Sequence, residues 1–312
     1  MPVIDLHCDT VLKLMDDREN LGLKKNDFSV DIEKLKKADS MAQFFALFVY
    51  LKSDRDPLEY CLDMLDKFYC EIEKNSNDIA LARNYNEMME NRKNGKISAF
   101  LTVEEGGVIK GQMHNLRNLY RLGVRLVTLT WNFPNEIGYP NAEDQYMNKG
   151  LTPFGKDVVS EMNRLGMLID VSHLSDGGFY DVAKLSSKPF VASHSNARSI
   201  TSHRRNLTDD MIKILADKGG VTGINFAKDF LGEAPLSTVC DMVKHIEHIR
   251  RVGGIDVIAL GTDFDGISPQ LEIENIGQIE KLICGLKKNK FSDDDIEKIF
   301  YKNALRVIKE VL

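Results

Sequence analysis

Cysteine is scarce in this sequence, and long apolar runs are absent. The 312 residues contain five cysteines, an odd number scattered along the chain, which excludes a disulfide framework and favours a reducing compartment. No apolar run approaches the ~20 residues that a membrane span needs. The opening residues, Met-Pro-Val-Ile-Asp-Leu-His, lack the basic region and apolar core of a secretory signal. We therefore expect a cytoplasmic protein that does not contact a membrane.

The chain also lacks an excess of either charge. It has 41 lysines and arginines against 47 aspartates and glutamates, a formal net charge of −6, with both signs spread along its length. Such a distribution gives no electrostatic surface for nucleic acid. There is no linker, low-complexity segment or internal repeat, so we expect one domain over residues 1–312. The oligomeric state is left open, with a homodimer as one option.

What the chain does contain is a series of short apolar runs, each followed by a helical pattern. Their length and content of Val, Ile, Leu and Phe are typical of strands buried on both faces. We predict strands at Val3–Leu6, Gln43–Val49, Ala99–Val103, Leu126–Leu129, Leu168–Val171, Phe190–Ser193, Val221–Asn225 and Val257–Gly261. The clearest helices are predicted at Leu58–Lys74, His114–Leu122, Lys156–Leu165, Asp209–Lys218 and Ser237–Val252, the last stopped by Gly253.

Eight strands alternating with helices indicate either a closed parallel barrel or an open doubly wound sheet. Polar side chains decide between the two. They are His7 and Asp9 after the first strand, Glu104 after the third, His173 after the fifth, His194 after the sixth and Asp263 after the eighth. In a barrel the carboxyl ends of all strands converge on one face, whereas an open sheet would keep the first and fifth strands apart. We therefore predict a (β/α)8 TIM barrel.

The segment His7-Cys8-Asp9 is a weak signal by itself. A lone His-x-Asp is more often a hydrogen-bonded histidine beside a helix-capping aspartate. In an extended strand, residues i and i+2 point the same way, so His7 and Asp9 would face one point while Cys8 turns away to pack. The other polar residues at strand ends favour the arrangement in which His7 and Asp9 face one point, as in a binding site.

Three of the seven histidines, His7, His173 and His194, lie just past predicted strand ends. Each alone could be a loop histidine, but three in equivalent positions indicate a site. The remaining four fit other roles. His114 begins a helix, His203 adjoins two arginines, and His245 and His248 lie three residues apart where a solvated helix face is expected.

Glu104-Glu105-Gly106-Gly107 follows the third predicted strand. Alternation should direct one carboxylate into the barrel mouth and the other away from it. A phosphate-binding glycine loop is the alternative, but no Lys-Ser or Lys-Thr follows.

Together these residues supply imidazoles and carboxylates without a thiolate, a set that suits Zn, Mn, Co or Fe at a catalytic centre. The five candidate ligands are His7, Asp9, Glu104, His173 and His194. They are more than one catalytic zinc takes, which favours two ions sharing a bridging carboxylate. Such pairs lie ~3.5–4 Å apart and lower the pKa of a bound water to ~7.

At this point the sequence resembles the membrane dipeptidase (renal dipeptidase) family over nearly its whole length. The motifs that carry the resemblance occur in order and are Ile4-Asp5-Leu6-His7-Cys8-Asp9, Val103-Glu104-Glu105-Gly106-Gly107, Leu122-Gly123-Val124-Arg125, Leu129-Thr130, the run from Asn163 to His173, Ser193-His194-Ser195, Arg204-Arg205-Asn206 and Gly261-Thr262-Asp263-Phe264-Asp265-Gly266. No single motif is decisive, but the ordered set is specific.

The resemblance implies a barrel of the metal-dependent amidohydrolase type with two divalent ions, expected to be zinc. By motif position, His7 and Asp9 would hold one ion, His173 and His194 the other, and Glu104 would bridge them. Asp263 would handle the proton, and Arg205 would bind the carboxylate of a small dipeptide substrate.

The sequence departs from the family at Trp131, where many members have a histidine after the Leu-Thr pair. We expect Trp131 to form an apolar pocket wall. Either Asn132 takes over the histidine's role as hydrogen-bond donor, or the metal alone stabilises the oxyanion. A tryptophan packed under the loop without touching substrate is the alternative.

The resulting hypothesis is a metallo-dipeptidase in which a metal-bridging hydroxide attacks the peptide carbonyl and Asp263 relays a proton to the leaving amine. The main alternative is a different binuclear-metal activity on the same barrel, that of another amidase or a lactonase, because one fold hosts many chemistries. A catalytically inactive binding protein is a further one. The preferred dipeptides, the stereochemistry accepted at the second residue and the metal used in the cell are not determined by the sequence.

Overall fold

A closed ring of parallel strands forms the centre of the molecule, as predicted. The computed structural model describes residues 1–16 and 21–312. Within them the strands are β1 (Val3–Cys8), β2 (Ser40–Phe48), β3 (Ile79–Leu81), β4 (Ile97–Glu104), β5 (Val124–Thr128), β6 (Leu168–Asp170), β7 (Val191–Ala192), β8 (Val221–Ile224) and β9 (Ile258–Leu260). They run in the order β2-β1-β9-β8-β7-β6-β5-β4, and a β2–β4 pairing closes the ring. This is a (β/α)8 barrel.

The extra strand is β3, which the sequence analysis did not predict. It pairs only with the first residues of β4, Ile79 opposite Ile97 and Leu81 opposite Ala99, and so lies outside the ring. At three residues it is too short for an alternation pattern to identify.

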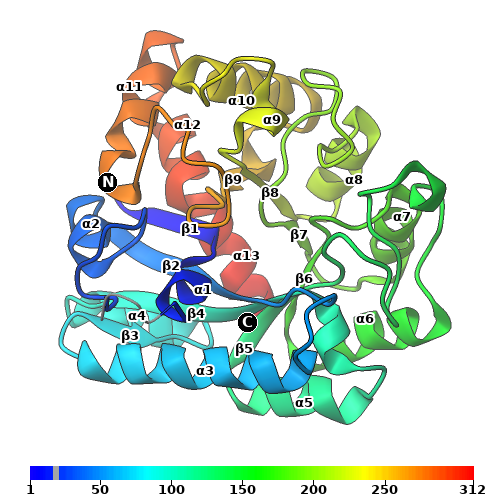
Figure 1. Cartoon of the computed structure of the whole chain (residues 1–312). Helices are drawn as coiled ribbons and strands as arrows, with labels where there is room; N and C mark the ends of the chain where they lie inside the picture. The colour runs from blue at the N-terminus through cyan, green and yellow to red at the C-terminus, as the bar shows by residue number, and fades with distance from the viewer. Residues whose placement is uncertain (17–20) are drawn as a thin grey trace.

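Helices surround the strands on all sides (Figure 1). Their bounds are α1 Thr10–Leu14, α2 Ile32–Lys37, α3 Pro57–Lys74, α4 Tyr85–Lys93, α5 Met113–Arg121, α6 Pro153–Leu165, α7 Asp176–Leu185, α8 Asp209–Asp217, α9 Lys228–Leu231, α10 Val239–Gly253, α11 Glu280–Lys288, α12 Asp293–Glu297 and α13 Asn303–Val311. The five predicted helices are α3, α5, α6, α8 and α10. None of the described helices is long and apolar enough to cross a membrane.

Local sequence sets the helix ends. Thr152 accepts a hydrogen bond from the amide of Gly155 at the start of α6, directly before Pro153, which is a favoured first residue. At the other end, Gly166 takes the left-handed conformation with φ 71° that releases the chain into β6. For α10 the predicted stop is one residue early: Gly253 is still helical, and Gly254 carries the positive φ of 85°.

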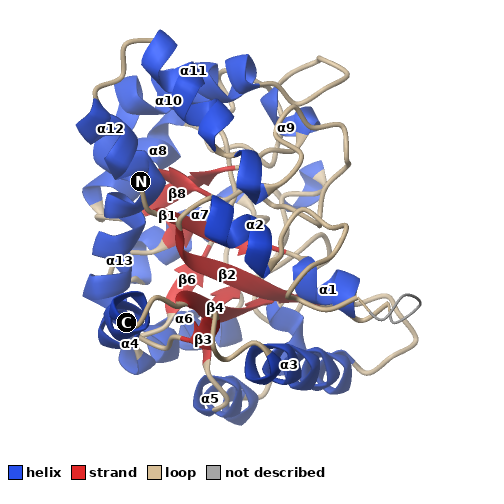
Figure 2. Cartoon of the chain, turned by 90° about the vertical axis from the view of Figure 1, so that its left-hand side faces the viewer, coloured by secondary structure: helices blue, strands red, loops and turns tan. Residues whose placement is uncertain are grey.

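Two apolar clusters hold the barrel together. One joins the strands to the surrounding helices. The other contains side chains from all eight ring strands, including Leu6, Phe44 and Phe100, and therefore fills the barrel interior. It also includes Val307 and Ile308 of α13, which lies at the opposite end of the barrel from α1 and α9 (Figure 2). α13 covers that end of the barrel, and the carboxyl termini of the strands form the other end.

Candidate metal centre

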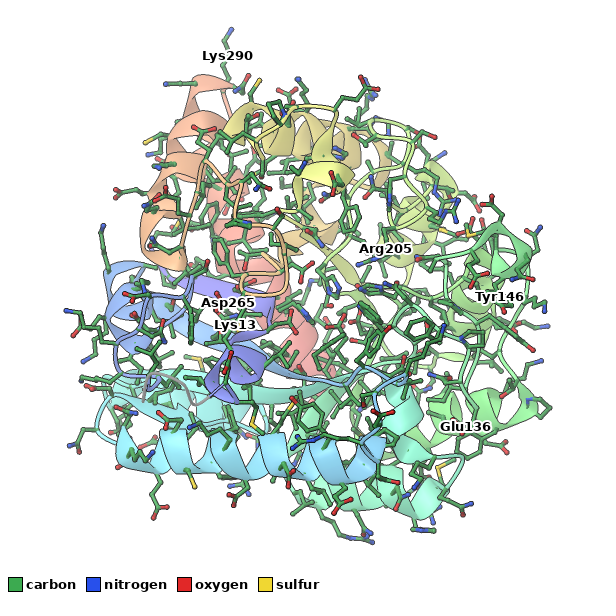
Figure 3. The ribbon with its side chains drawn as sticks, viewed as in Figure 1. Lys13, Glu136, Tyr146, Arg205, Asp265 and Lys290 are labelled. Carbon is green, nitrogen blue, oxygen red and sulfur yellow. The ribbon has the colours of Figure 1, made fainter. Side chains whose placement is uncertain are left out.

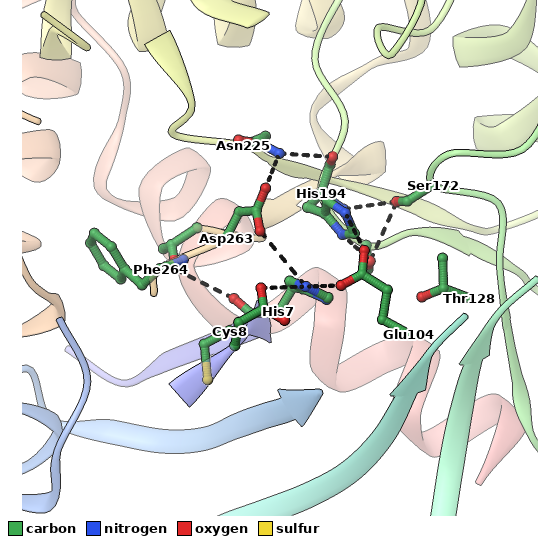
Figure 4. A network of polar contacts seen from close by, with 12 residues as sticks. His7, Cys8, Glu104, Thr128, Ser172, His194, Asn225, Asp263 and Phe264 are labelled. Carbon is green, nitrogen blue, oxygen red and sulfur yellow. Dashed lines mark hydrogen bonds and ion pairs between the residues drawn. The ribbon is translucent and has the colours of Figure 1, made fainter. Parts of the chain in front are cut away.

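The five predicted metal ligands meet at the carboxyl ends of the strands. Glu104 is the last residue of β4, while His173 and His194 follow β6 and β7. His7 Nε2 lies 3.3 Å from Asp9 Oδ2, and His173 Nε2 lies 3.1 Å from His194 Nε2. All of these side chains are almost fully buried. Figure 4 shows Glu104 facing His7, with the sulfur of Cys8 turned away, as alternation predicts.

The two carboxylate oxygens of Glu104 face different histidines. Oε2 lies 3.2 Å from His7 Nε2. Oε1 lies 3.2 Å from His173 Nε2 and 3.5 Å from His194 Nε2. A carboxylate placed between two groups of ligands in this way has the geometry of a bridging ligand. The neighbouring Glu105 points elsewhere: it accepts hydrogen bonds from the amides of Gly107 and Trp131.

The donor set fits two divalent cations. Three groups of residues each bring their ligand atoms within 4.8 Å of one another, namely His7–Asp9–Glu104, Glu104–His173–His194 and His7–His194–Asp263. Ligand atoms around a tetrahedral zinc with bonds of ~2.0–2.1 Å lie ~3.3 Å apart, close to the separations seen here. In addition, Nδ1 of His7 and Oδ1 of Asp9 are buried without a hydrogen bond. Buried polar atoms are normally paired, so these atoms indicate a missing partner.

The electrostatics of the site also favour cation binding. Burial lowers the pKa of His173 to about 4, with the charge of Arg205 adding to the effect. Burial likewise holds the pKa of His194 well below its usual value. Both imidazoles are therefore neutral at pH 7, the form that binds metal. For His7, burial opposes protonation, but the carboxylates of Glu104 and Asp9 raise its pKa well above the usual value. A cation would replace that proton.

Asp263 lies beside the five ligands, as expected for the end of the last strand. Its Oδ1 is 3.8 Å from His7 Nε2, and its Oδ2 accepts a hydrogen bond of 2.8 Å from Asn225 Nδ2. Burial raises its pKa to about 8, and the negative charges of Asp9 and Glu104 contribute. Bound cations would lower that pKa again. The geometry thus allows Asp263 to carry a proton. It also allows Asp263 to bind a metal ion together with His7 and His194, because their ligand atoms lie within 4.8 Å of one another.

The backbone is strained around this cluster. His173, Asp263 and Glu105 have φ angles of 65°, 62° and 102°, in a region that side chains other than glycine rarely adopt. Such outliers cost about 1–3 kcal/mol each and gather at functional sites. Gly266 is needed for a related reason, since a Cβ there would lie 2.1 Å from Asp9 Oδ2.

A pocket of about 270 Å³ opens onto the cluster. This is near the lower end of the ~300–1,000 Å³ typical of small-molecule sites. Asp9, Glu104, His173 and Asp263 form its polar floor, and its walls are Leu12, Phe48, Trp131, Asn132, Ala227, Lys228, Asp229, Phe230, Gly266, Ile267 and Ser268. Trp131 and Asn132 therefore line the pocket. Contact between Trp131 and a substrate stays a prediction.

Arg205 lies behind the pocket wall. Its guanidinium donates to Ser195 Oγ at 3.3 Å and to the His194 carbonyl at 3.2 Å, and it stands over the ring of Phe230 at 5.3 Å. It comes from the segment between β7 and β8 (Figure 3). Its Nε is buried without a hydrogen bond. Within the described part of the chain, the cationic side chain that lines the pocket directly is that of Lys228, which was not predicted from the sequence.

Other residues of the site were also missed. Asn225, Phe48 and Phe230 carried no motif, although Asn225 directly follows β8, where barrel chemistry is expected. The expectation of a solvated face for His245 and His248 was wrong, since both are buried. His245 accepts from the amide of Ala197, and His248 contacts Asp209 at 2.7 Å, because the segment before α8 and the first residue of α8 cover this face of α10.

Comparison with known proteins agrees with this geometry. The sequence model of the membrane dipeptidase family, peptidase family M19, matches residues 1–312. An uncharacterised dipeptidase of Schizosaccharomyces pombe is 32% identical, over 99% of this chain and 80% of that protein. Among solved structures, a dipeptidase of family M19 superposes with a TM-score of 0.92 at 25% identity, covering 100% of this chain and 98% of the other.

A metallo peptidase from Rhodobacter sphaeroides, solved with a phosphinate mimic of the dipeptide L-Ala-D-Ala, has the same fold. Its TM-score is 0.92 at 24% identity, over 100% of this chain and 99% of that one. The predicted family resemblance is thus confirmed. The chain belongs to the membrane dipeptidase family, peptidase family M19, a family of metal-dependent hydrolases acting on dipeptides.

Proposed function

We propose that the protein hydrolyses dipeptides at a centre of two divalent cations, expected to be zinc. His7 and Asp9 would hold one ion, His173 and His194 the other, and Glu104 would bridge them. The observation that carries this proposal is the position of Glu104, whose two oxygens face His7 on one side and the His173–His194 pair on the other. One mononuclear zinc site would not use all five groups.

The chain's own residues supply binding and proton transfer. When bound, the ions would provide a hydroxide near neutral pH and polarise the peptide carbonyl. Asp263 would take a proton in the pocket and return it to the leaving amine. Its position in the pocket floor, next to the ligands, supports this role. Asn225 orients this carboxylate through the 2.8 Å bond to its other oxygen.

Substrate binding would use both the polar and the apolar parts of the pocket. If His173 Nε2 binds an ion, its Nδ1 carries the proton and donates to Asn132 Oδ1 at 3.1 Å. The amide NH2 of Asn132 then remains to donate to the substrate. Trp131 offers an apolar face to a side chain. A cation is required for the free carboxylate of a dipeptide, and Arg205 or Lys228 would supply it.

Metal analysis combined with a substrate panel tests the proposal. Gently purified protein should contain close to two equivalents of divalent metal and should cleave dipeptides, with L,L and L,D pairs compared directly. C-terminally amidated dipeptides, esters and lactones serve as controls for the alternative of another amidase or lactonase. One equivalent in fully active, metal-replete protein would contradict the two-ion centre. Faster turnover of lactones than of any dipeptide would contradict the assigned substrate.

A further inference from the structure

Asp170 is a fully buried carboxylate beneath the candidate metal centre, and the function proposed above assigns it no role. It is the last residue of β6, and each oxygen has two hydrogen-bond donors. Oδ1 accepts from the amides of Ser172 at 3.0 Å and Ser193 at 2.8 Å. Oδ2 accepts from Thr128 Oγ1 at 2.7 Å and Ser193 Oγ at 2.6 Å. The carboxylate is thus held in one orientation.

The hydroxyl of Ser193 connects Asp170 to His194, one of the proposed metal ligands. A carboxylate can only accept hydrogen bonds, so the Ser193 hydroxyl must donate its single proton to Asp170. The hydroxyl oxygen also lies 2.7 Å from Nδ1 of His194. Because its proton is already used, Ser193 can only accept there, and Nδ1 must be the nitrogen that carries hydrogen. Nε2 of His194 is then left with a lone pair, pointing toward Glu104 and His173.

We propose that Asp170, acting through the hydroxyl of Ser193, is a positioning residue that fixes His194 in the tautomer able to bind a metal ion. The inference rests on the proposed function in taking His194 as a ligand. Histidine ligands commonly donate their second N–H to an acceptor, and loss of that acceptor weakens metal binding about 10- to 100-fold.

The hydrogen bonds from Asp170 through Ser193 to His194, called the relay from here on, reach only the ion held by His173 and His194. His173 Nδ1 donates instead to the side-chain oxygen Oδ1 of Asn132, and Nδ1 of His7 is buried without a hydrogen bond. Disturbing Asp170 should therefore weaken the ion held by His173 and His194 and spare the ion held by His7 and Asp9. A residue that merely stabilised the barrel would not separate the two ions in this way.

Asp170→Asn is the sharpest test, because it conserves the shape of the side chain and reverses the direction of its hydrogen bond with Ser193. The two backbone amides require an acceptor, so the new amide oxygen must take the place of Oδ1 and the NH2 group that of Oδ2. The NH2 group would then donate to Ser193, whose proton would turn toward Nδ1 of His194. That places the imidazole hydrogen on Nε2, the tautomer that cannot bind metal through that atom.

Three measurements follow. Nitrogen-15 NMR of histidine-labelled, metal-free protein should show His194 protonated at Nδ1 in the wild type and at Nε2 in the Asp170→Asn variant. Zinc titration against a chelator should show one ion about 10- to 100-fold weaker in that variant and the other unchanged. The visible spectrum of the cobalt-loaded variant should lose the contribution of one site.

Ser193→Ala and Thr128→Val separate the relay from simple packing. Ser193→Ala removes the hydroxyl and keeps both backbone bonds to Asp170, so it should also weaken one ion, though less than the reversed polarity of Asp170→Asn. Thr128→Val removes a bond to the same Oδ2 without touching His194, and both ions should bind normally. Equal weakening of both ions, equal effects of Thr128→Val and Ser193→Ala, or a wild-type tautomer in Asp170→Asn would overturn the relay.

The tautomer measurement requires neither metal nor substrate. Wild-type protein that shows the Nδ1–H tautomer but binds fewer than two ions would leave the relay standing and contradict the proposed function instead.

Discussion

At the scale of single residues, Asp263 has two chemical roles open to it, and one substitution distinguishes them. Asp263→Asn keeps the shape and the bond to Asn225 but cannot carry a proton. If Asp263 moves the proton, kcat should fall by about 10²- to 10⁴-fold with metal content unchanged. Measuring turnover and metal content on the same preparation checks this. Loss of one equivalent of metal would instead make Asp263 a ligand with His7 and His194.

Asp265→Asn is the matched control for that variant. Asp265 lies two residues further along the same loop, also has a positive φ of 70°, and bonds Thr10 Oγ1 and the Ser29 amide outside the pocket. Its substitution should leave kcat nearly unchanged. A similar loss of turnover in both variants would show that the loop had been disturbed and that Asp263 had not been tested by itself.

Two cationic side chains, Arg205 and Lys228, are candidates for binding the substrate carboxylate, and single substitutions distinguish them. Arg205→Met and Lys228→Met each remove one charge. Loss of a charge-assisted hydrogen bond costs about 1.5–3 kcal/mol, or roughly ten- to a hundred-fold in kcat/KM. We expect the larger loss in Arg205→Met, on free dipeptides and not on C-terminally amidated ones. Comparing both substrate sets for both variants checks it, and a selective loss in Lys228→Met alone would transfer the role to Lys228.

At the scale of elements, the loop after β5 builds an aromatic wall over the pocket. Trp131 contacts Phe48, Tyr50 and Phe133 edge to face, with ring centroids 4.9, 5.8 and 5.7 Å apart. Its amide is held by Glu105, so the indole position follows from the turn after β4. Because Trp131 lines the pocket, Trp131→Phe should change relative rates among dipeptides with different side chains and spare turnover on the best one. Steady-state kinetics across the panel measure this.

Phe133→Leu provides the comparison for the aromatic wall, since Phe133 packs on Trp131 without lining the pocket. It should shift selectivity less. A loss of about a hundred-fold on every substrate in Trp131→Phe, the size expected for a missing oxyanion donor, would instead make the indole N–H part of the chemistry.

The elements also show why some features could be predicted from the sequence. Strand ends can be located from short apolar runs, and in a barrel those ends must converge, so His7, Glu104, His173 and His194 could be grouped without a structure. Contacts made by irregular segments leave no such periodicity. The burial of His245 depends on how the segment before α8 folds over α10, and the pocket position of Lys228 depends on where the short helix α9 lies at the barrel mouth. Neither could be predicted.

At the scale of the whole molecule, the barrel brings several carboxylates into one buried cluster, where they repel one another and lose their contact with water. Asp9, Glu104 and Asp263 are three carboxylates within a few ångströms, and burial raises the pKa of Asp9 to about 6 and that of Asp263 to about 8. Water solvates these groups in the unfolded chain, so the metal-free barrel bears a cost that bound cations would offset. The ligands come from β1, β4 and the segments after β6 and β7. Bound cations would therefore hold together strands that are far apart in the sequence.

Metal removal should therefore destabilise the entire barrel. An ion at about 100 times its Kd stabilises the folded state by about 2.7 kcal/mol, so two ions should raise Tm by on the order of 10 °C. Scanning calorimetry with and without a chelator measures the shift, and restoring zinc should reverse it. Glu104→Ala, which removes the bridge, should melt near the metal-free wild type and respond little to the chelator. An unchanged wild-type Tm after verified metal loss would mean that cations do not hold these strands together, and that the cluster is stable through the pairing of His7 with Glu104 and Asp9 alone.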